Sequence, residues 1–418
     1  MTQIHSKFNI HHSILFMRIL QLCRKFPYPL KDGEAIAVTN LAKAYQGLGH
    51  EVILLSFNTI KTYYDTQQLP ASFNHYTAIH TVYLDNRVTI KGAFLNLFTS
   101  DSYHITRFIS STFKDKLKEI LSNHKFDLVQ LEGINVAPYI PIIREHSQAK
   151  IVMRAHNVEF EIWERVANTT SFLPKKWYLQ HLVKQLKQYE IDQLSAYDLL
   201  LAMTQRDLNI FKQLAPINEA LVTPIGLDLK DYQNTPPLTV PPYSISFIGS
   251  LDWMPNQDGL KWFLEKVWPA IHQKYPTLTF HIAGRNPPPW VFGKAGNGVI
   301  VHGEVADAKT FVLSHPITVV PLLSGSGMRV KILESMALGR AVLTTSIGLE
   351  GIEANHQQEV LIGDTPTEFI ALLDYCLSFP EQVQRIAKNA RDFAFKKYDN
   401  MAIGKKVLQV MESDEVIS

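Results

Sequence analysis

PLLSGSGMRVKILESMALG, residues 321–339, joins the end of a predicted strand to a predicted helix through a glycine loop. Gly325 and Gly327 flank Ser326, and glycine lets the backbone approach a ligand closely and turn its N–H groups outward. Strand, glycine loop and helix in this order are the unit from which parallel α/β sheets are built. The stretch therefore predicts both the fold class and the place of a ligand.

Two cations and a carboxylate follow the glycine loop. Arg329 and Lys331 stand at the start of the helix, which is itself mildly electropositive, so a bound anion would explain them. Glu334 lies three residues beyond Lys331 on roughly the same helix face, where a carboxylate can accept hydrogen bonds from sugar hydroxyls. The stretch predicts a nucleotide-sugar site, with the diphosphate on the loop and the cations and the ribose on Glu334. The alternative is an amphipathic helix whose charged side chains are only solvated.

The composition is that of a globular protein of two or three domains. The 418 residues are 46% hydrophobic and 19% charged, and a formal net charge of +2 gives no general attraction to nucleic acid. Cys23 and Cys376, the two cysteines, argue against a disulfide framework and favour a reducing compartment. No apolar run is long enough to span a bilayer, and residues 1–16 resemble an N-terminal extension.

Strand and helix patterns alternate along two halves of the chain. The first predicted domain, residues 17–226, ends before a linker, residues 227–242, that contains four prolines. The second predicted domain covers residues 243–398, and a last helix within residues 399–418 could pack back on the first domain. Predicted strands cover residues 18–23, 51–57, 127–131, 150–154, 199–203 and 220–224, then 244–248, 278–283, 299–301, 318–322, 341–345 and 360–362. Two doubly wound parallel sheets should therefore face each other across a cleft.

Polar side chains follow two strands of the first domain. Glu132 comes at the end of one strand, and His156 and Glu159 come just after the next. Ligands of open parallel sheets bind at the carboxyl ends of the strands, so these residues are expected near the chemistry. Glu132 and Glu159 are candidates for acceptor binding or for supporting His156, and a structural role is equally open for each.

Residues 58–125 are less regular and contain an apolar patch, residues 92–98, with Arg87, Lys91 and Arg107 nearby. Such a patch could contact a lipid surface or a lipid-linked acceptor. The alternative is a helical excursion that packs on its own domain.

The ordered motifs resemble those of a known enzyme family. They read PYPLKDG (27–33), GLGHEVILLS (47–56), RAHNVE (154–159), FIGSLDWMPNQDGLKWF (247–263), HIAGR (281–285), VHGEVAD (301–307), the stretch 324–352 and EVLIGD (359–364). Together they resemble retaining glycosyltransferases of the two-Rossmann-domain class (GT-B fold), family GT4, or glycosyltransferase group 1. The resemblance covers nearly the whole chain from Met17.

The resemblance implies roles for single residues. His156 would be the active-site histidine beside the donor sugar and the reacting centre, and Glu334 would hold the donor ribose. Arg329 and Lys331 would face the diphosphate. The donor-binding set implied or indicated is Gly33, Gly249, Ser250, Val305, Gly325, Ser326, Gly327, Arg329, Lys331 and Glu334.

The sequence departs from the family pattern at two positions. Ser326 stands where the family often has a carboxylate that contacts donor-sugar hydroxyls. Glu34 follows Gly33 where a second glycine is common, and a carboxylate there would repel a phosphate unless it points elsewhere.

The predicted activity is sugar transfer from a nucleoside-diphosphate sugar, UDP- or GDP-linked, to a saccharide or lipid-linked acceptor of cell-surface polysaccharide or glycolipid synthesis. The sequence has no D-x-D cluster, so neither a metal nor any other cofactor is expected, and the nucleotide sugar is a co-substrate. The expected location is cytoplasmic, with peripheral contact to the inner face of the membrane and no nucleic-acid partner. A nucleotide-sugar epimerase on the same fold and a non-catalytic nucleotide-sugar-binding subunit are the alternatives.

Overall fold

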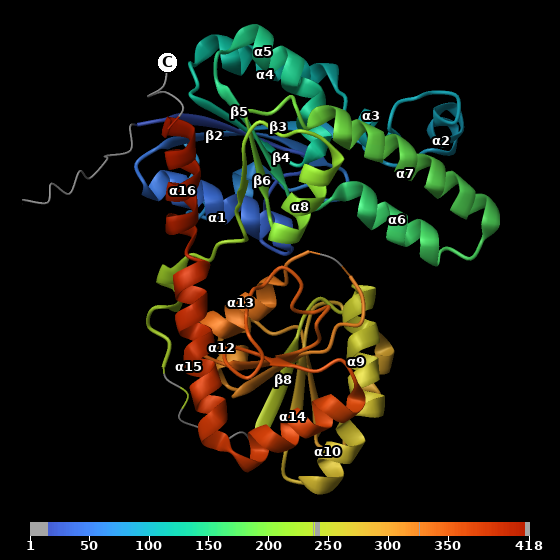
Figure 1. Ribbon diagram of the computed structural model, residues 1–418, viewed down its shortest axis with the longest axis vertical. Coiled ribbons are helices and arrows are strands. Elements are labelled where there is room, and N and C mark those ends of the chain that lie inside the picture. The colour runs from blue at the N-terminus through green and yellow to red at the C-terminus, as the bar shows by residue number, and fades with distance from the viewer. Residues whose placement is uncertain (1–15, 237, 239–242, 326, 414–418) are drawn as a thin grey trace, which may run out of the picture.

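The chain folds into two α/β domains stacked along the long axis of the molecule, shown blue to green and yellow to red in Figure 1. This computed structural model describes residues 16–236, 238, 243–325 and 327–413. Each domain is built on a parallel sheet, of seven strands in the first and six in the second. The predicted two-domain, doubly wound architecture is confirmed. The predicted extension lies almost wholly outside the described residues, as does Ser326.

The first sheet has the order β3-β2-β1-β4-β5-β6-β7, and all of its neighbouring strands run parallel. The register places Cys23, the last residue of the first strand, beside Glu132, the last residue of the fourth. The strands are β1 (Arg18–Cys23), β2 (Glu51–Thr59), β3 (Ala78–Leu84), β4 (Leu128–Glu132), β5 (Lys150–Ala155), β6 (Leu199–Ala202) and β7 (Ala220–Val222).

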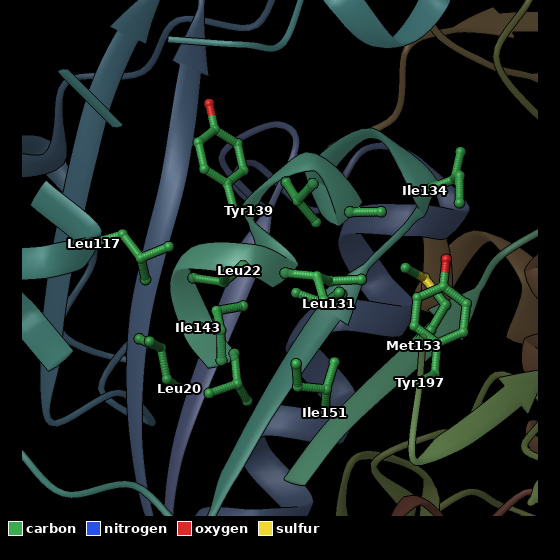
Figure 2. Close-up of a cluster of buried hydrophobic side chains, with 14 of the residues drawn as sticks. Leu20, Leu22, Leu117, Leu131, Ile134, Tyr139, Ile143, Ile151, Met153 and Tyr197 are labelled. Carbon is green, nitrogen blue, oxygen red and sulfur yellow. The ribbon is translucent and has the colours of Figure 1, made fainter. Parts of the chain in front are cut away.

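Helices cover both faces of this sheet, which is why its central strands are almost continuously apolar. Figure 2 shows one face, where Leu20, Leu22, Leu131 and Ile151 pack together. The helices are α1 (Gly33–Gly47), α2 (Ile90–Asn96), α3 (Tyr103–Thr106), α4 (Ser111–Asn123), α5 (Ile140–His146), α6 (Glu159–Thr169), α7 (Leu173–Gln193) and α8 (Gln205–Leu214), with short 3-10 helices η1 (Thr66–Gln68) and η2 (Ile134–Tyr139).

The region 58–125 is more regular than the sequence indicated. It contains β3 at the sheet edge, followed by α2, α3 and α4. Most residues of β3 are only half-buried, so the strand lacks the apolar run that identified its neighbours. Helix α6 was likewise not predicted, and α7 begins and ends three residues before the predicted span 176–196.

The second sheet has the order β10-β9-β8-β11-β12-β13 and is also parallel. Its strands are β8 (Ser244–Ile248), β9 (Thr279–Ala283), β10 (Val299–Gly303), β11 (Ile317–Val320), β12 (Ala341–Thr344) and β13 (Leu361–Ile362). Its helices are α9 (Met254–Lys266), α10 (Trp268–Lys274), α11 (Pro289–Phe292), α12 (Ala308–Leu313), α13 (Val330–Ala337), α14 (Pro366–Ser378) and α15 (Pro380–Lys397). All six predicted strands are present, with bounds shifted by at most two residues.

The chain crosses between the domains twice, and the two crossings touch. Leu227 donates its N–H to the carbonyl of Tyr398 at 2.7 Å and accepts from the N–H of Asn400 at 3.0 Å. Helix α16 (Asn400–Ser413) then packs along α1 of the first domain (Figure 1). The predicted linker contains a 3-10 helix, η3 (Leu229–Tyr232), that the sequence pattern did not indicate.

Candidate functional site

Both sheets reverse their strand order at one point, and the candidate site lies at both reversals. The reversal falls between β1 and β4 in the first sheet and between β8 and β11 in the second. Loops that leave neighbouring strands in opposite directions open a crevice there, which is where ligands of such sheets bind. The loop before α1, Gly133 after β4, Gly249 after β8 and the glycine loop after β11 all occupy these places.

A cavity of about 380 Å³ lies between the domains at this position. Residues from the loop before α1 form one wall, including Leu30 and Lys31. The opposite wall brings together five residues that the sequence predicted for the site, from three separate segments of the second domain: Gly249, Ser250, Val305, Lys331 and Glu334. Arg285 joins the walls because its Nη2 donates to the carbonyl of Lys31 at 2.8 Å.

Lys331 is one of the cations that line the cavity. Its Nζ donates to Asn256 Oδ1 at 2.7 Å and lies 4.9 Å from the centre of the Phe247 ring. Burial, with Arg329 nearby, lowers the pKa of Lys331 to about 7. None of the ion pairs found in the described part of the chain includes Lys331, so no carboxylate offsets the cost of burying its charge.

Glycine at position 249 gives this ammonium its room. A Cβ on Gly249 would lie 3.0 Å from Lys331 Nζ and 2.9 Å from Asn256 Nδ2. Any larger residue would displace the lysine. Glycine at the end of β8 therefore leaves room for the Lys331 ammonium. It also lets a ligand approach the backbone closely.

The glycine loop after β11 adopts backbone conformations that favour glycine. Gly325 has a φ of 108° and Gly327 a φ of 80°. The guanidinium of Arg329 donates to the carbonyl of Gly327 and lies 5.6 Å from the centre of the Trp253 ring. Arg329 is 6% exposed, and burial lowers its pKa. Arg329 immediately precedes the first helical residue of α13. It therefore lies beside the glycine loop, where the sequence predicted that an anion binds.

Glu334, one turn into α13, is held by a residue from the interdomain connection. Tyr232 donates its hydroxyl to Glu334 Oε1 at 3.3 Å, and the Lys309 ammonium lies 4.6 Å from the centre of the Tyr232 ring. Burial raises the pKa of Glu334, although the Tyr232 hydrogen bond and Lys309 act in the other direction. The carboxylate thus reaches the cavity with one oxygen already oriented.

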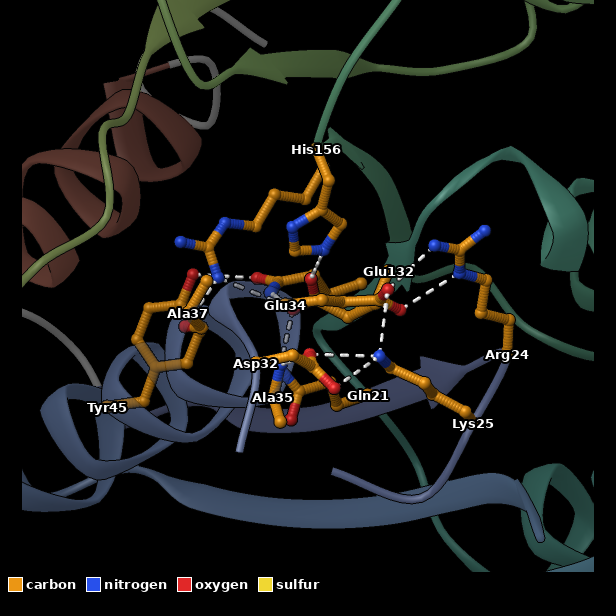
Figure 3. Close-up of polar contacts among 12 residues, drawn as sticks. Gln21, Arg24, Lys25, Asp32, Glu34, Ala35, Ala37, Tyr45, Glu132 and His156 are labelled. Carbon is orange, nitrogen blue, oxygen red and sulfur yellow. Dashed lines mark hydrogen bonds and ion pairs between the residues drawn. The ribbon is translucent and has the colours of Figure 1, made fainter. Parts of the chain in front are cut away.

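On the other side of the cleft, His156 is fixed by a buried carboxylate. Its Nε2 lies 2.8 Å from Glu132 Oε2, and Glu132 also accepts from Gln21 and Gln130 (Figure 3). Arg154 Nη1 lies 3.8 Å from Glu132 Oε1. Burial would raise the pKa of Glu132, but Arg154 and the hydrogen bonds outweigh it and lower the pKa. Glu132 is fully buried, so of the two roles considered for it the support of His156 fits the geometry and acceptor contact does not.

This arrangement fixes the tautomer of a neutral His156. An ionised carboxylate only accepts hydrogen bonds, so the proton of the imidazole resides on Nε2. Nδ1 is then left with a lone pair that can accept a hydrogen bond from a sugar hydroxyl.

Two cations pair with the Glu34 carboxylate. Its negative charge is therefore balanced and does not have to repel a bound phosphate. Arg24 Nη2 lies 2.7 Å from one carboxylate oxygen and Arg24 Nε 3.0 Å from the other, and Lys25 Nζ is 3.3 Å away (Figure 3). Burial opposes ionisation, yet these partners hold the pKa of Glu34 well below its ordinary range. Gly33, just before it, faces the start of α13, because a Cβ there would lie 3.7 Å from Val330.

His156 and Glu159 line a second, smaller cavity rather than the 380 Å³ one. The glycine loop faces this side of the first domain at Gly327, since a Cβ there would lie 3.0 Å from Asn157 Oδ1, and both residues line a third, small cavity. Glu159 begins α6, and its N–H is bonded at 3.2 Å to Glu190, whose pKa burial raises to about 8. The described residues contain no group of three or more His, Cys, Asp or Glu arranged to hold a metal ion.

Sequence reasoning missed several residues of the site. Lys31 and Arg285 lie inside motifs that the sequence analysis quoted. Their positive charge could therefore have indicated that they belong to an anion-binding site. Asn256, which orients Lys331, and Tyr232, which orients Glu334, had no such signal. Their roles depend on how the β8 loop and the linker fold back on α13.

Comparison with known proteins identifies the class of the second domain. Residues 242–378 match the family model of the glycosyl transferases group 1. The match contains β8 to β13 and all of the cavity wall from Gly249 to Glu334, so the second domain carries a glycosyltransferase domain.

Full-length likenesses extend over both domains. A 44.6 kDa protein in the cps region of Klebsiella pneumoniae is 24% identical over 403 residues, covering 92% of this chain and 97% of the relative. Sucrose-phosphate synthase from Thermosynechococcus elongatus superimposes with a TM-score of 0.68 at 14% identity, covering 96% of this chain and 100% of that one. Anabaena Alr3699/HepE in complex with UDP gives 0.64 at 14% identity, covering 95% and 100%. These solved structures share the GT-B fold of this chain.

Proposed function

We propose that this protein is a retaining glycosyltransferase of family GT4 that moves a sugar from a nucleoside-diphosphate sugar to a saccharide or lipid-linked acceptor. The observation that carries the proposal is Lys331, a half-buried ammonium in the same cavity as Glu334 and without a carboxylate partner in the described part of the chain. A diphosphate supplies the anionic partner that Lys331 lacks. The UDP and UDP-glucose complexes of Anabaena HepE support a UDP-linked donor, with GDP-linked as the second choice.

The proposed reaction breaks the bond between the anomeric carbon and the diphosphate oxygen and forms one to the acceptor oxygen. Lys331 and Arg329 stabilise the charge that develops on the leaving diphosphate, which in such a site is worth a few kcal/mol per donor. In a front-face reaction the acceptor proton passes to the departing phosphate, so neither a protein base nor a metal ion is required. Nδ1 of His156 accepts a hydrogen bond from a donor-sugar hydroxyl and holds the sugar in place.

The Klebsiella relative is named for its position in the cps region, and this supports a role for the present protein in cell-surface polysaccharide synthesis. The proposed setting is the cytoplasmic face of the membrane, where a lipid-linked acceptor would be reached from the protein's periphery. No helix among the described residues is long and apolar enough to cross a membrane.

A thermal-shift screen with UDP, GDP, ADP and CMP tests the donor site. A nucleotide at a hundred times its Kd stabilises the native state by about 2.7 kcal/mol. We expect one nucleotide to raise Tm in the native protein and in the control Lys261→Met, which changes an exposed lysine of α9. The shift should be lost in Lys331→Met and Glu334→Ala. No response to any nucleotide would contradict the proposal.

An activity assay separates the three functions considered for this site. The responding sugar nucleotide is incubated with and without saccharide acceptors, with and without EDTA. Transfer that survives EDTA supports the proposal. An isomerised donor formed without acceptor would show an epimerase, and a bound nucleotide without transfer or hydrolysis would show a binding subunit.

A further inference from the structure

Large apolar side chains project into solvent from one side of the first domain. Ile90, Phe94 and Phe98 on and after α2 are 92%, 59% and 76% exposed. Phe172, Leu173 and Trp177 at the turn between α6 and α7 and in the first turn of α7 are 66%, 75% and 61% exposed. We call these six residues the aromatic surface. Single exposed apolar residues are ordinary, whereas six from two neighbouring segments need an explanation.

The two segments belong to one surface because Tyr103 of α3 holds them together. Its hydroxyl accepts the N–H of Thr89, the residue that caps α2, at 3.2 Å. Its ring packs on a cluster formed by Leu179, Leu182 and other residues of α6 and α7. Figure 1 shows α2 and the hairpin of α6 and α7 on the same side of the first domain.

The charged side chains within the two segments that carry the aromatic surface are of one sign. Residues 86–98 and 170–189 contain six lysines and arginines and no aspartate or glutamate, although the whole chain has 41 cations and 39 anions. Arg87 pairs with Asp85 just outside the first segment. Lys91, Lys175 and Lys176 adjoin the aromatic residues and take part in none of the ion pairs of the described residues.

We propose that the aromatic surface binds an anionic lipid bilayer. Aromatic and aliphatic side chains enter at the level of the headgroups while the lysines contact lipid phosphates. Only the patch on α2 was evident in the sequence. The structure adds the hairpin of α6 and α7, and it ties Arg107 to the carbonyls of Tyr103 and Asn86, so this cation is not free for lipid.

The position of α6 links this surface to the candidate active site. The helix begins at Glu159, three residues after His156, and ends at Thr169, three residues before Phe172. Its eleven residues span about 16 Å. The inference rests on the proposed function in one respect, because α6 would then separate His156 from a lipid-linked acceptor held at the membrane.

Co-sedimentation with vesicles of phosphatidylglycerol and phosphatidylcholine, compared with phosphatidylcholine alone, tests the inference. We expect binding to the anionic vesicles only, weakened by salt. Phe94→Ser/Phe98→Ser, Phe172→Ser/Trp177→Ser and Lys175→Glu/Lys176→Glu should each lower the partition coefficient at least tenfold. Matched controls on the second domain are Phe292→Ser/Phe379→Ser, 51% and 49% exposed, and Lys396→Glu/Lys397→Glu. These controls should bind like the native protein.

Three outcomes would overturn the inference. The first is equal binding by the native protein and all variants, and the second is no binding at all. The third is a dimer in sedimentation velocity that dissociates in Phe172→Ser/Trp177→Ser, since the surface would then join two copies of the chain. The nucleotide thermal shift, measured on the same variants, shows that they are folded and reports on the donor site separately, so vesicle binding and donor binding fail independently.

Discussion

The two walls of the cleft differ in whether their charged side chains have partners of opposite charge. On the first domain two carboxylates near the cleft are paired with cations, Glu132 with Arg154 and Glu34 with Arg24 and Lys25. On the second domain Lys331 is half-buried without a carboxylate partner, and Glu334 accepts a hydrogen bond from a neutral hydroxyl. A charged side chain with a partner of opposite charge is held in place. A charged side chain without such a partner lowers stability, and a bound ligand of opposite charge can restore it. The first wall is therefore a rigid support for His156, and the second is prepared for an anion.

Breaking a matched pair on the first wall should give the largest effect. Glu132→Gln leaves Arg154 buried without a carboxylate, so the free energy of unfolding should fall by about 3–5 kcal/mol. Chemical denaturation measures the loss. The control Glu51→Gln breaks the partly exposed pair with Arg18 and should cost less than about 1 kcal/mol. Equal losses in the two variants would show that burial does not distinguish these pairs.

The unpaired Lys331 on the second-domain wall should make the free energy of unfolding depend on pH. The pKa of Lys331 is about 7 in the native state against an ordinary value of 10.5, so between these values the unfolded state binds more protons. The free energy of unfolding should therefore rise with pH across this window, by at most about 1.4 kcal/mol per unit, and Lys331→Met should lose that slope. Denaturation at pH 7, 8 and 9 measures it.

Binding of a diphosphate should reverse the same shift. The anion favours the charged ammonium, so at pH 8 we expect proton uptake on binding, seen as a difference in calorimetric heat between two buffers of unlike ionisation enthalpy. Proton uptake that persists in Lys331→Met would assign it to another group.

The smallest effect is expected where the second wall is already hydrogen-bonded. Tyr232→Phe keeps the ring but removes the hydroxyl from Glu334, which should weaken nucleotide binding about 2- to 13-fold, or about 0.5–1.5 kcal/mol. Tyr275→Phe, which removes a surface hydroxyl from Asp374, is the matched control. Calorimetric titration with the responding nucleotide compares them. An unchanged affinity in Tyr232→Phe would mean that the hydroxyl does not orient Glu334 for the ribose.

The fold was predictable where strands are buried on both faces. Strands β1 and β8 have the bounds that the apolar runs indicated, because a central parallel strand is covered by helices on both sides. The edge strand β3 was not predictable in this way, since only Val82 among its seven residues is buried. Its place is fixed by the pairing with β2.

The site was predictable only as separate pieces. The glycines, Lys331 and Glu334 carry local signals, because loop conformation and helix spacing are properties of short segments. The hydrogen bond from Tyr232 to Glu334 joins residues 102 positions apart, and that between Arg285 and Lys31 joins residues 254 apart. Such contacts depend on how the domains meet.

The return of α16 to the first domain has a consequence for synthesis of the chain. Val407 and Leu408 are fully buried in the same core cluster as Val38 and Leu41 of α1. The ribosome makes α1 early and α16 last, so the apolar face of α1 stays uncovered while the entire second domain is being made. The first domain to be synthesised is thus the last to complete its core, and loss of the final helix would damage the domain at the opposite end of the sequence.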